Sequence, residues 1–277
     1  MSTAARHTFR IRGVRGSAPV CGSEFLRHGG HTTCFTLETD EGVIVFDGGT
    51  GISLLEAELG DAAPSRPIHL FFTHFHLDHL IGLPSFSPLY RPGQALTLCG
   101  DPARQPRWQD GLRTFLAPPY WPVDLARSPA RISLCDLPAN APSVDVLGIR
   151  ISWCPVWHPQ TCLAYRIETP SAGIVIATDH ECGDVALDAR FLRFCRNADF
   201  LIYDAQYTPD EYTRHRGWGH STWRDGAAIA REAGVRELLL THHDGRRTDD
   251  QIDELVSHAR RAFPRTRAAS DNLTLIE

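Results

Sequence analysis

Short apolar runs that each end at a histidine or an aspartate form the main hydrophobic pattern of the sequence. The runs have four to six residues, mostly Ile, Val, Leu and Phe. This length suits strands covered on both faces and is too short for buried helices. Because polar groups at the ends of neighbouring strands meet at one edge of a sheet, the pattern predicts a functional site at that edge. The runs, each with the residue that follows it, are Val43 to Phe46 with Asp47, Ile68 to Thr73 with His74, Ile174 to Thr178 with Asp179, Phe200 to Tyr203 with Asp204, and Glu237 to Thr241 with His242.

Helical segments are predicted between these strands, so the sequence indicates an α/β fold. Asp249 to Ala262 has an acidic first turn after a capping Thr248 and a basic last turn, and both favour the helix dipole. Thr222 to Ala233 ends before Gly234, a natural C-cap. Three further helices are predicted over Gly51 to Leu59, Ala103 to Leu116 and Ala186 to Ala198.

Residues 84–141 are rich in proline and aromatic residues. We interpret them as an insertion that covers the site, because the strand pattern continues on both sides. The 277 residues are therefore predicted to form one domain, 1–277. Tyr120 and Trp121 of the insertion are candidates for stacking on a base of a substrate, and equally for core packing or a subunit contact.

Composition narrows the class of partner. The formal charge is -5, and all 28 basic residues are arginine, so stable nucleic-acid binding is not expected. Eight scattered cysteines without a C-x-x-C pair indicate reduced thiols, and we interpret Cys182 as a passive thiol. The N-terminus has no apolar signal segment, and no apolar stretch approaches the length of a membrane span. The prediction is a cytoplasmic protein without a membrane segment.

The stretch THFHLDH, Thr73 to His79, carries three histidines and an aspartate. Residues i and i+2 lie about 200° apart on a helix, so His74 and His76 can bind one ion only from an extended or looped backbone. A loop directly after the strand that ends at Thr73 supplies that geometry. The stretch therefore predicts a metal site.

Further ligand candidates lie at other strand ends, and two have a neighbouring rival. His180 stands beside Asp179, and His243 beside His242, which is favoured as the first residue past its apolar run. Seven ligand side chains exceed the needs of one tetrahedral ion and suffice for two ions that share a carboxylate. The donors suit Zn²⁺, with Mn²⁺ or Fe as alternatives. The predicted ligands are His74, His76 and His158 on the first ion, Asp78, His79 and His242 on the second, and Asp179 as the bridge.

H-x-H-x-D-H after a strand, followed by a His, an Asp and a His at later strand ends, resembles the metallo-β-lactamase superfamily. The resemblance covers most of the chain, from Gly16-Ser17-Ala18-Pro19 and Gly29-Gly30-His31-Thr32-Thr33-Cys34 through FDGGTG to LTHHD. It implies a four-layer αββα sandwich with a dinuclear metal site along one edge. A homodimer is a further expectation from this resemblance alone.

Two later stretches are similar to the phosphodiesterase branch that contains the tRNA 3'-processing endonucleases (RNase Z). YDAQYTPDEY carries Asp204 at the position of an acid that orients a histidine, and GWGHSTW carries His220 at the position of the histidine that faces the phosphate. GHST also predicts a helix N-cap at Ser221 or Thr222, and the two interpretations are compatible. The chain departs from the branch at Asp204, where Glu is more familiar, and at His31, where Asn is common.

The resemblance implies a dinuclear metal-dependent hydrolase, a phosphodiesterase acting through a metal-bridging hydroxide. The expected substrate is a small phosphodiester or nucleotide, of cyclic-nucleotide or RNA 3'-end type, because the chain has no obvious basic arm for tRNA. Asp47 is expected to orient a metal-binding histidine. The alternative is a thioester, lactone or β-lactam hydrolase of the same fold. The predicted catalytic residues are Asp78, His220 and Asp204.

Overall fold

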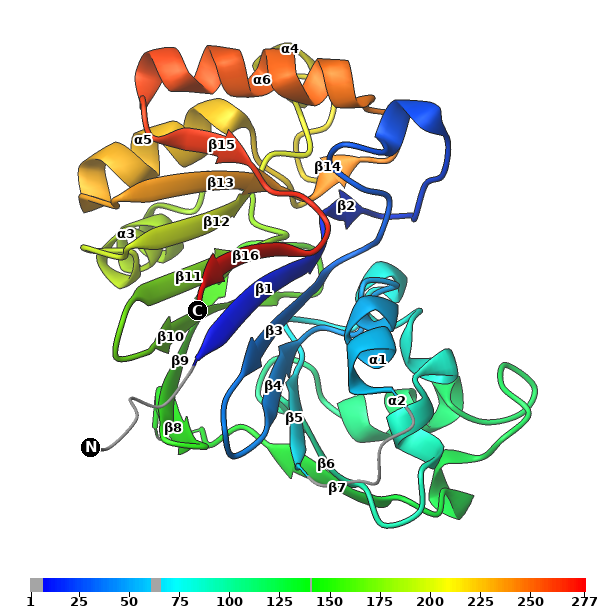
Figure 1. Ribbon diagram of the computed structural model, residues 1–277. Coiled ribbons are helices and arrows are strands. Elements are labelled where there is room, and N and C mark those ends of the chain that lie inside the picture. Colours follow the sequence, from blue (N-terminus) through cyan, green and yellow to red (C-terminus); the bar gives the residue numbers. More distant parts are fainter. Residues whose placement is uncertain (1–6, 61–65, 140) are drawn as a thin grey trace. The chain divides into compact units, whose positions relative to one another are not determined.

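The computed structural model describes residues 7–60, 66–139 and 141–277, and within them the chain forms two compact units. Of the described residues, the first unit comprises 7–13, 31–60, 66–139 and 272–277, and the second comprises 14–30 and 141–271. Each unit contains one seven-stranded sheet (Figure 1). The single domain over 1–277 stays a prediction from the sequence.

The sheet of the first unit joins the two ends of the chain. Its last strand along the chain, β16, pairs with β1, and the four strands from β4 to β7 are parallel. Helices α1 (Ile52–Leu59) and α2 (Trp108–Phe115) bury Leu55 and Leu112 against apolar strand residues such as Leu70. The strand order is β16 (Leu273–Ile276), β1 (Thr8–Gly13), β3 (Cys34–Glu38), β4 (Val43–Phe46), β5 (Ile68–Phe71), β6 (Ala95–Gly100) and β7 (Arg131–Asp136).

The sheet of the second unit is parallel from β11 to β15 and antiparallel from β8 to β11. Helices α3 (Val185–Phe194), α5 (Trp223–Ala233) and α6 (Asp249–Ala262) contribute Phe191, Ala227 and Ile252 to one core with the strands. The strand order is β15 (Thr266–Ala268), β13 (Glu237–Thr241), β12 (Phe200–Asp204), β11 (Gly173–Ala177), β10 (Cys162–Glu168), β9 (Ile149–Val156) and β8 (Ser143–Val146).

Short elements complete the two units. The strands β2 and β14 form a parallel pair in the second unit. No helix among the described residues is both long and apolar enough to cross a membrane. The short elements are β2 (Arg15–Gly16), β14 (His243–Asp244), α4 (Pro209–Tyr212) and the 3-10 helices η1 (Ser23–Phe25), η2 (Leu77–His79), η3 (Leu83–Ser85), η4 (Ser87–Tyr90) and η5 (Leu125–Arg127).

The five apolar runs are strands, as predicted, but they belong to two sheets. β4 and β5 are parallel neighbours in the first unit, and β11, β12 and β13 are parallel neighbours in the second. The apolar runs predict that strands exist but not which strands pair. We expected the polar residues that follow them to lie at one edge of a single sheet, and they are instead divided between the edges of two sheets.

Residues 84–141 were expected to cover the site, and part of this segment instead extends the first sheet. It supplies β6 and β7, which continue the parallel order after β5. These strands, ALTLCG and RISLCD, alternate in polarity, so a search for continuous apolar runs misses them. Asn140, also in this segment, lies outside the described residues.

Candidate metal centre

The loop after β5 carries the histidine-rich stretch of the first unit. His76 has an extended backbone, with φ -68° and ψ 154°, and precedes η2. The ring centroids of His74 and His76 are 4.4 Å apart, and those of His74 and His79 are 4.3 Å apart. The loop therefore gathers the three rings as an extended backbone was expected to do, and it buries His74, Asp78 and His79.

Asp47 and Thr73 orient the histidines of this loop. The Asp47 carboxylate accepts hydrogen bonds from the Thr73 backbone N–H and hydroxyl and from His79 Nδ1, each at 2.8 Å. Because the Thr73 hydroxyl gives its proton to Asp47, it accepts from His74 Nδ1 at 3.1 Å. Burial raises the pKa of Asp47, and its hydrogen bonds from His79 and Thr73 oppose that shift. In both rings the proton is therefore on Nδ1, and Nε2 is the atom suited to bind a metal.

The second unit places Asp179, His158 and His242 together. Asp179 Oδ2 lies 3.2 Å from His242 Nε2, and Asp179 Oδ1 lies 3.8 Å from His158 Nε2. His158 Nδ1 donates to the Gly219 carbonyl at 2.8 Å, and His242 Nδ1 donates to Gln206 Oε1 at 3.0 Å. All three side chains are buried. As in the first unit, the ring proton is on Nδ1 and the Nε2 lone pair faces a carboxylate.

These distances fit bound divalent cations. Two ligand atoms that each lie about 2.1 Å from one tetrahedral ion are about 3.4 Å apart. The separations are 3.2 and 3.8 Å around Asp179, and 3.4 Å between His79 Nε2 and Asp78 Oδ2. A lone pair held against a carboxylate is repulsive, and a cation between the two reverses the sign of that interaction. Imidazole and carboxylate donors of this kind suit Zn²⁺ and related ions.

His220 lies beside this cluster and is held by Asp204. Asp204, at the end of β12, accepts from His220 Nδ1 at 2.8 Å. The His220 ring centroid lies 5.2 Å from that of His158 and 5.1 Å from that of His242. With Nδ1 engaged by Asp204, Nε2 is the atom of His220 that can reach a substrate.

The turn before α5 combines the helix cap with the placement of His220. Thr222 is the N-cap of α5, and it forms a capping box with Asp225. Ser221 accepts a hydrogen bond from the Tyr203 hydroxyl at 3.0 Å. Of the two expected cap residues the structure places Thr222 in that role, and the backbone that it fixes also carries His220.

The neighbouring histidines are engaged elsewhere. His180 Nδ1 is hydrogen-bonded to the Tyr203 hydroxyl oxygen at 3.0 Å, and its ring contacts Phe191. His243 Nε2 donates to the Leu240 carbonyl at 3.1 Å, and burial holds the pKa of His243 well below its usual value. His242 rather than His243 therefore faces Asp179.

Other residues considered from the sequence lie as follows. His31 Nδ1 is 3.3 Å from the Thr50 hydroxyl, and burial lowers the pKa of His31. Tyr120 is exposed, and Trp121 is partly buried. Burial raises the pKa of Cys182 to about 12, which agrees with a passive thiol.

Sequence reasoning missed Gln206 and Glu181. Gln206 orients His242, as described above, and Glu181 holds the turn that contains His220. The Glu181 carboxylate accepts from the backbone N–H of Gly217 at 2.8 Å and of Gly219 at 2.7 Å. The only sequence signal for Glu181 is its place two residues after Asp179.

Comparisons with known proteins agree with this fold. A family model described as the β-lactamase superfamily domain matches residues 44–243. Ribonuclease BN of Escherichia coli K12 is 25% identical over 292 residues, covering 84% of this chain and 88% of that protein. The metallo-β-lactamase fold protein YhfI from Bacillus subtilis aligns with a TM-score of 0.73 and 20% identity, over 97% of this chain and 99% of that one. A diphosphatase from the PhnP family aligns with a TM-score of 0.71 and 19% identity, over 98% of each chain. The α/β fold class of metallo-β-lactamase type is thereby confirmed.

Proposed function

The chain belongs to the β-lactamase superfamily and is a metal-dependent hydrolase of the metallo-β-lactamase fold, and we propose that it hydrolyses phosphodiester bonds with two divalent metal ions. The observation that carries the proposal is the Asp204–His220 pair next to Asp179. His220 Nδ1 lies 2.8 Å from Asp204 and 3.8 Å from Asp179 Oδ1. Two similar proteins are named a ribonuclease and a diphosphatase, and both names denote hydrolysis at phosphorus.

The proposed ligands are those that the order of motifs predicts. Zn²⁺ is our assignment for both ions, and Mn²⁺ or Fe²⁺ would suit the same donors. The hydrogen bonds at Nδ1 of His74, His79, His158 and His242 support this set, because they direct Nε2 toward the metal. We assign His74, His76 and His158 to the first ion, Asp78, His79 and His242 to the second, and Asp179 to both.

The bound ions would polarise the phosphoryl group and lower the pKa of water so that it attacks phosphorus. The protein supplies the general acid: His220 donates the proton on Nε2 to the leaving oxygen, while Nδ1–H stays with Asp204. The Asp204 carboxylate fixes the ring direction and stabilises the imidazolium that donates this proton. Glu181 and Gly219 keep the backbone of His220 in place.

The proposed substrate is a small phosphodiester or nucleotide. The net charge of -5 and the lack of lysine argue against a long polyanion as the main substrate, because affinity for such a chain comes chiefly from basic side chains. Hydrolysis of a thioester, lactone or β-lactam is the alternative. Attack of hydroxide at a carbonyl carbon does not require a histidine next to the leaving oxygen of a phosphodiester. The effect of replacing His220 on the reaction rate therefore distinguishes the two reactions.

The test compares His220→Ala with His258→Ala, a change to a partly buried histidine of α6 that is remote from Asp204 in sequence. We expect His220→Ala to lower kcat for bis-p-nitrophenyl phosphate about 100-fold or more, because general acid catalysis contributes on that order. Metal content should stay near two equivalents by elemental analysis, and His258→Ala should behave as the wild type.

Two outcomes would overturn the proposal. One is an unchanged phosphodiesterase rate in His220→Ala. The other is a wild type that turns over thioester or β-lactam substrates faster than bis-p-nitrophenyl phosphate and cyclic nucleotides, with His220→Ala as active on them as the wild type.

A further inference from the structure

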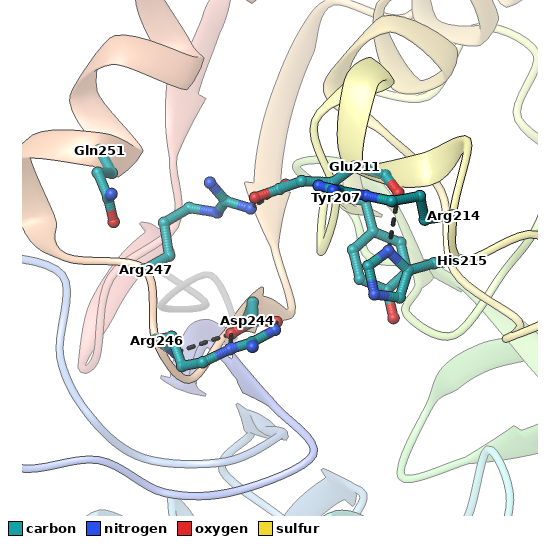
Figure 2. A pocket seen from close by; sticks show the side chains of 8 residues that line it. All are labelled: Tyr207, Glu211, Arg214, His215, Asp244, Arg246, Arg247 and Gln251. Carbon is teal, nitrogen blue, oxygen red and sulfur yellow. Dashed lines mark hydrogen bonds and ion pairs between the residues drawn. The ribbon is translucent and has the colours of Figure 1, made fainter.

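A cavity of about 350 Å³ lies in the second unit, and three arginines are among the residues that line it (Figure 2). We name it the arginine pocket and define it by Arg214, Arg246, Arg247, Tyr207 and His215, which line it. Figure 2 shows Arg247 extending to Glu211, the Arg246–Asp244 pair on another side, and the stacked rings of Tyr207 and His215. Its volume is in the range of small-ligand sites.

Tyr207 connects the arginine pocket to the proposed general acid. Its ring meets the His220 ring edge-on, with centroids 5.9 Å apart, and stacks on His215 with centroids 4.4 Å apart. The Tyr207 backbone N–H donates to the Ser221 carbonyl at 3.2 Å. One aromatic ring therefore separates the pocket from the side chain that is proposed to protonate the leaving group.

Arg247 connects the pocket to the metal ligands. Its Nη2 donates to the Gln206 carbonyl at 3.1 Å, and the side chain of Gln206 accepts from His242. Arg247 also forms an ion pair with Glu211 at 2.6 Å, is only 8% exposed, and has no hydrogen-bond partner for Nε among the described residues. It is a buried guanidinium, paired with Glu211, that lines the pocket.

The charges that line the pocket do not cancel. Asp244 binds Arg246 through two hydrogen bonds of 3.0 and 2.9 Å, and Glu211 binds Arg247. Arg214 is exposed and forms no ion pair within the described part of the chain. Three guanidiniums thus face two carboxylates, and the remaining positive charge favours an anion in the pocket.

The donors suit a phosphate group. Arginine presents several N–H groups in a planar fork that matches phosphate oxygens. The Tyr207 hydroxyl accepts from Gln206 Nε2 at 3.3 Å, so its own proton can be donated to a ligand. Burial raises the pKa of Tyr207 to about 12, which keeps that proton in place at neutral pH.

We propose that the arginine pocket binds a second phosphate group of the substrate and so selects nucleotides that carry a phosphate next to the scissile phosphodiester. This inference rests on the proposed phosphodiesterase function. It narrows the substrate class from any small phosphodiester to one with two phosphate groups, such as a phosphorylated dinucleotide. The Tyr207–His215 wall would pack against the sugar or base between them.

The test uses three dinucleotides with the same scissile bond: UpU, 5'-phosphorylated pUpU and 3'-phosphorylated UpUp. We expect the Zn²⁺-loaded wild type to prefer one phosphorylated form over UpU in kcat/KM by about 10-fold or more, the range for charge-assisted hydrogen bonds. Arg214→Gln/Arg246→Gln should reduce that ratio to about one. Arg231→Gln, which removes an exposed arginine at the end of α5, should retain it.

A second variant and a binding measurement test the pocket even if the double variant folds poorly or the dinucleotides are not hydrolysed. Arg214→Gln alone removes an exposed side chain that forms no ion pair with any described residue, so it tests the pocket without disturbing folding, and it should lower the ratio several-fold. Calorimetric titration with uridine 3',5'-bisphosphate measures binding without turnover, and the double variant should bind it about 10-fold more weakly.

The failures of the two proposals are distinguishable. Equal kcat/KM for the three dinucleotides in the wild type, or a preference that survives in the double variant, overturns the pocket and leaves phosphodiester hydrolysis standing. If none of the three is hydrolysed, the phosphodiesterase proposal fails on these substrates. The pocket is then decided by calorimetry, where equal affinity in wild type and double variant overturns it.

Discussion

Three residues of the candidate site adopt a left-handed backbone: Asp47 with φ 61°, Asp179 with φ 54° and His242 with φ 57°. Each lies within two residues of a strand end. Such conformations cost about 1 to 3 kcal/mol for a non-glycine residue and persist where the surrounding structure holds them. The left-handed backbone points each of these side chains in a direction that the regular up-and-down alternation of a strand would not give.

At the residue scale the sequence predicts candidate ligands, but it does not predict how their rings are oriented. The end of the ELLLT run favoured His242 over His243, and the structure places His242 against Asp179. The partners that orient the rings, Gln206 and the Gly219 carbonyl, come from segments far along the chain, so no local pattern contains them.

Gly219 is the residue where this orientation can be tested. It has φ 91°, and a Cβ there would lie 2.0 Å from His158 Nδ1. Gly219→Ala should therefore displace the His158 ring and weaken metal binding about 10- to 100-fold, the range for lost orienting contacts. Competition with a chelator of known affinity measures the change.

The matched control is Gly217→Ala in the same turn. Gly217 also has a positive φ, 83°, but a Cβ on this residue would meet no atom of the described residues within 4 Å. Gly217→Ala should cost about 1 kcal/mol of folding free energy through its positive φ, but its Cβ would not displace a histidine ring. Equal metal affinity in the two variants would contradict the role given to Gly219.

At the scale of elements, the sequence predicted a helix end correctly where it contained a capping residue. α6 begins after Thr248 and α5 ends before Gly234, as predicted. α2 was expected from Ala103 but begins at Trp108, because Arg107 has φ 61°. α3 ends at Phe194 instead of Ala198, and Asn197 in the following turn has φ 54°. Arg107 gave no sequence signal of a helix boundary, whereas Asn197 is a residue type that adopts the left-handed conformation after helix ends.

Thr222 and Thr248 form a natural pair for testing what a helix cap does for the site. Both are N-caps with a capping box, Thr222 for α5 and Thr248 for α6. Each Thr→Ala change should lower the free energy of unfolding by about 1 kcal/mol, measured by urea denaturation. Only Thr222→Ala should also lower kcat for bis-p-nitrophenyl phosphate, because Thr222 fixes the backbone two residues from His220. Equal kcat in the two variants would show that the cap contributes stability alone.

For the whole molecule, the order of the predicted metal ligands along the chain said more about the fold class than the amino-acid composition did. The fold class followed from the motifs from Thr73 to His242, whereas the division into two sheets did not follow from the runs. The pairing of β16 with β1 joins segments more than 200 residues apart, and β6 and β7 alternate in polarity. The pairing of β16 with β1 depends on tertiary contacts that a single sequence does not display, whereas β6 and β7 were missed because the pattern sought was a continuous apolar run.

Metal removal tests the molecule as a whole. A ligand that binds only the folded chain stabilises it by about 2.7 kcal/mol when present at 100 times its Kd. Removing the ions would also leave the Nε2 lone pairs of His79 and His242 against carboxylates at 3.4 and 3.2 Å. Chelation should therefore lower Tm by several degrees, because about 1 kcal/mol corresponds to roughly 2 to 4 °C in a chain of this size.

The control for this measurement is His242→Gln, which removes a proposed ligand, and Zn²⁺ added back to the chelated wild type should restore Tm. In His242→Gln the shift on chelation should be smaller, because one ion is bound more weakly and contributes less to folding. His258→Ala should keep the full shift. A wild-type Tm that is the same with and without chelator, in samples that lose two equivalents of metal, would contradict the coupling between these buried side chains and the stability of the fold.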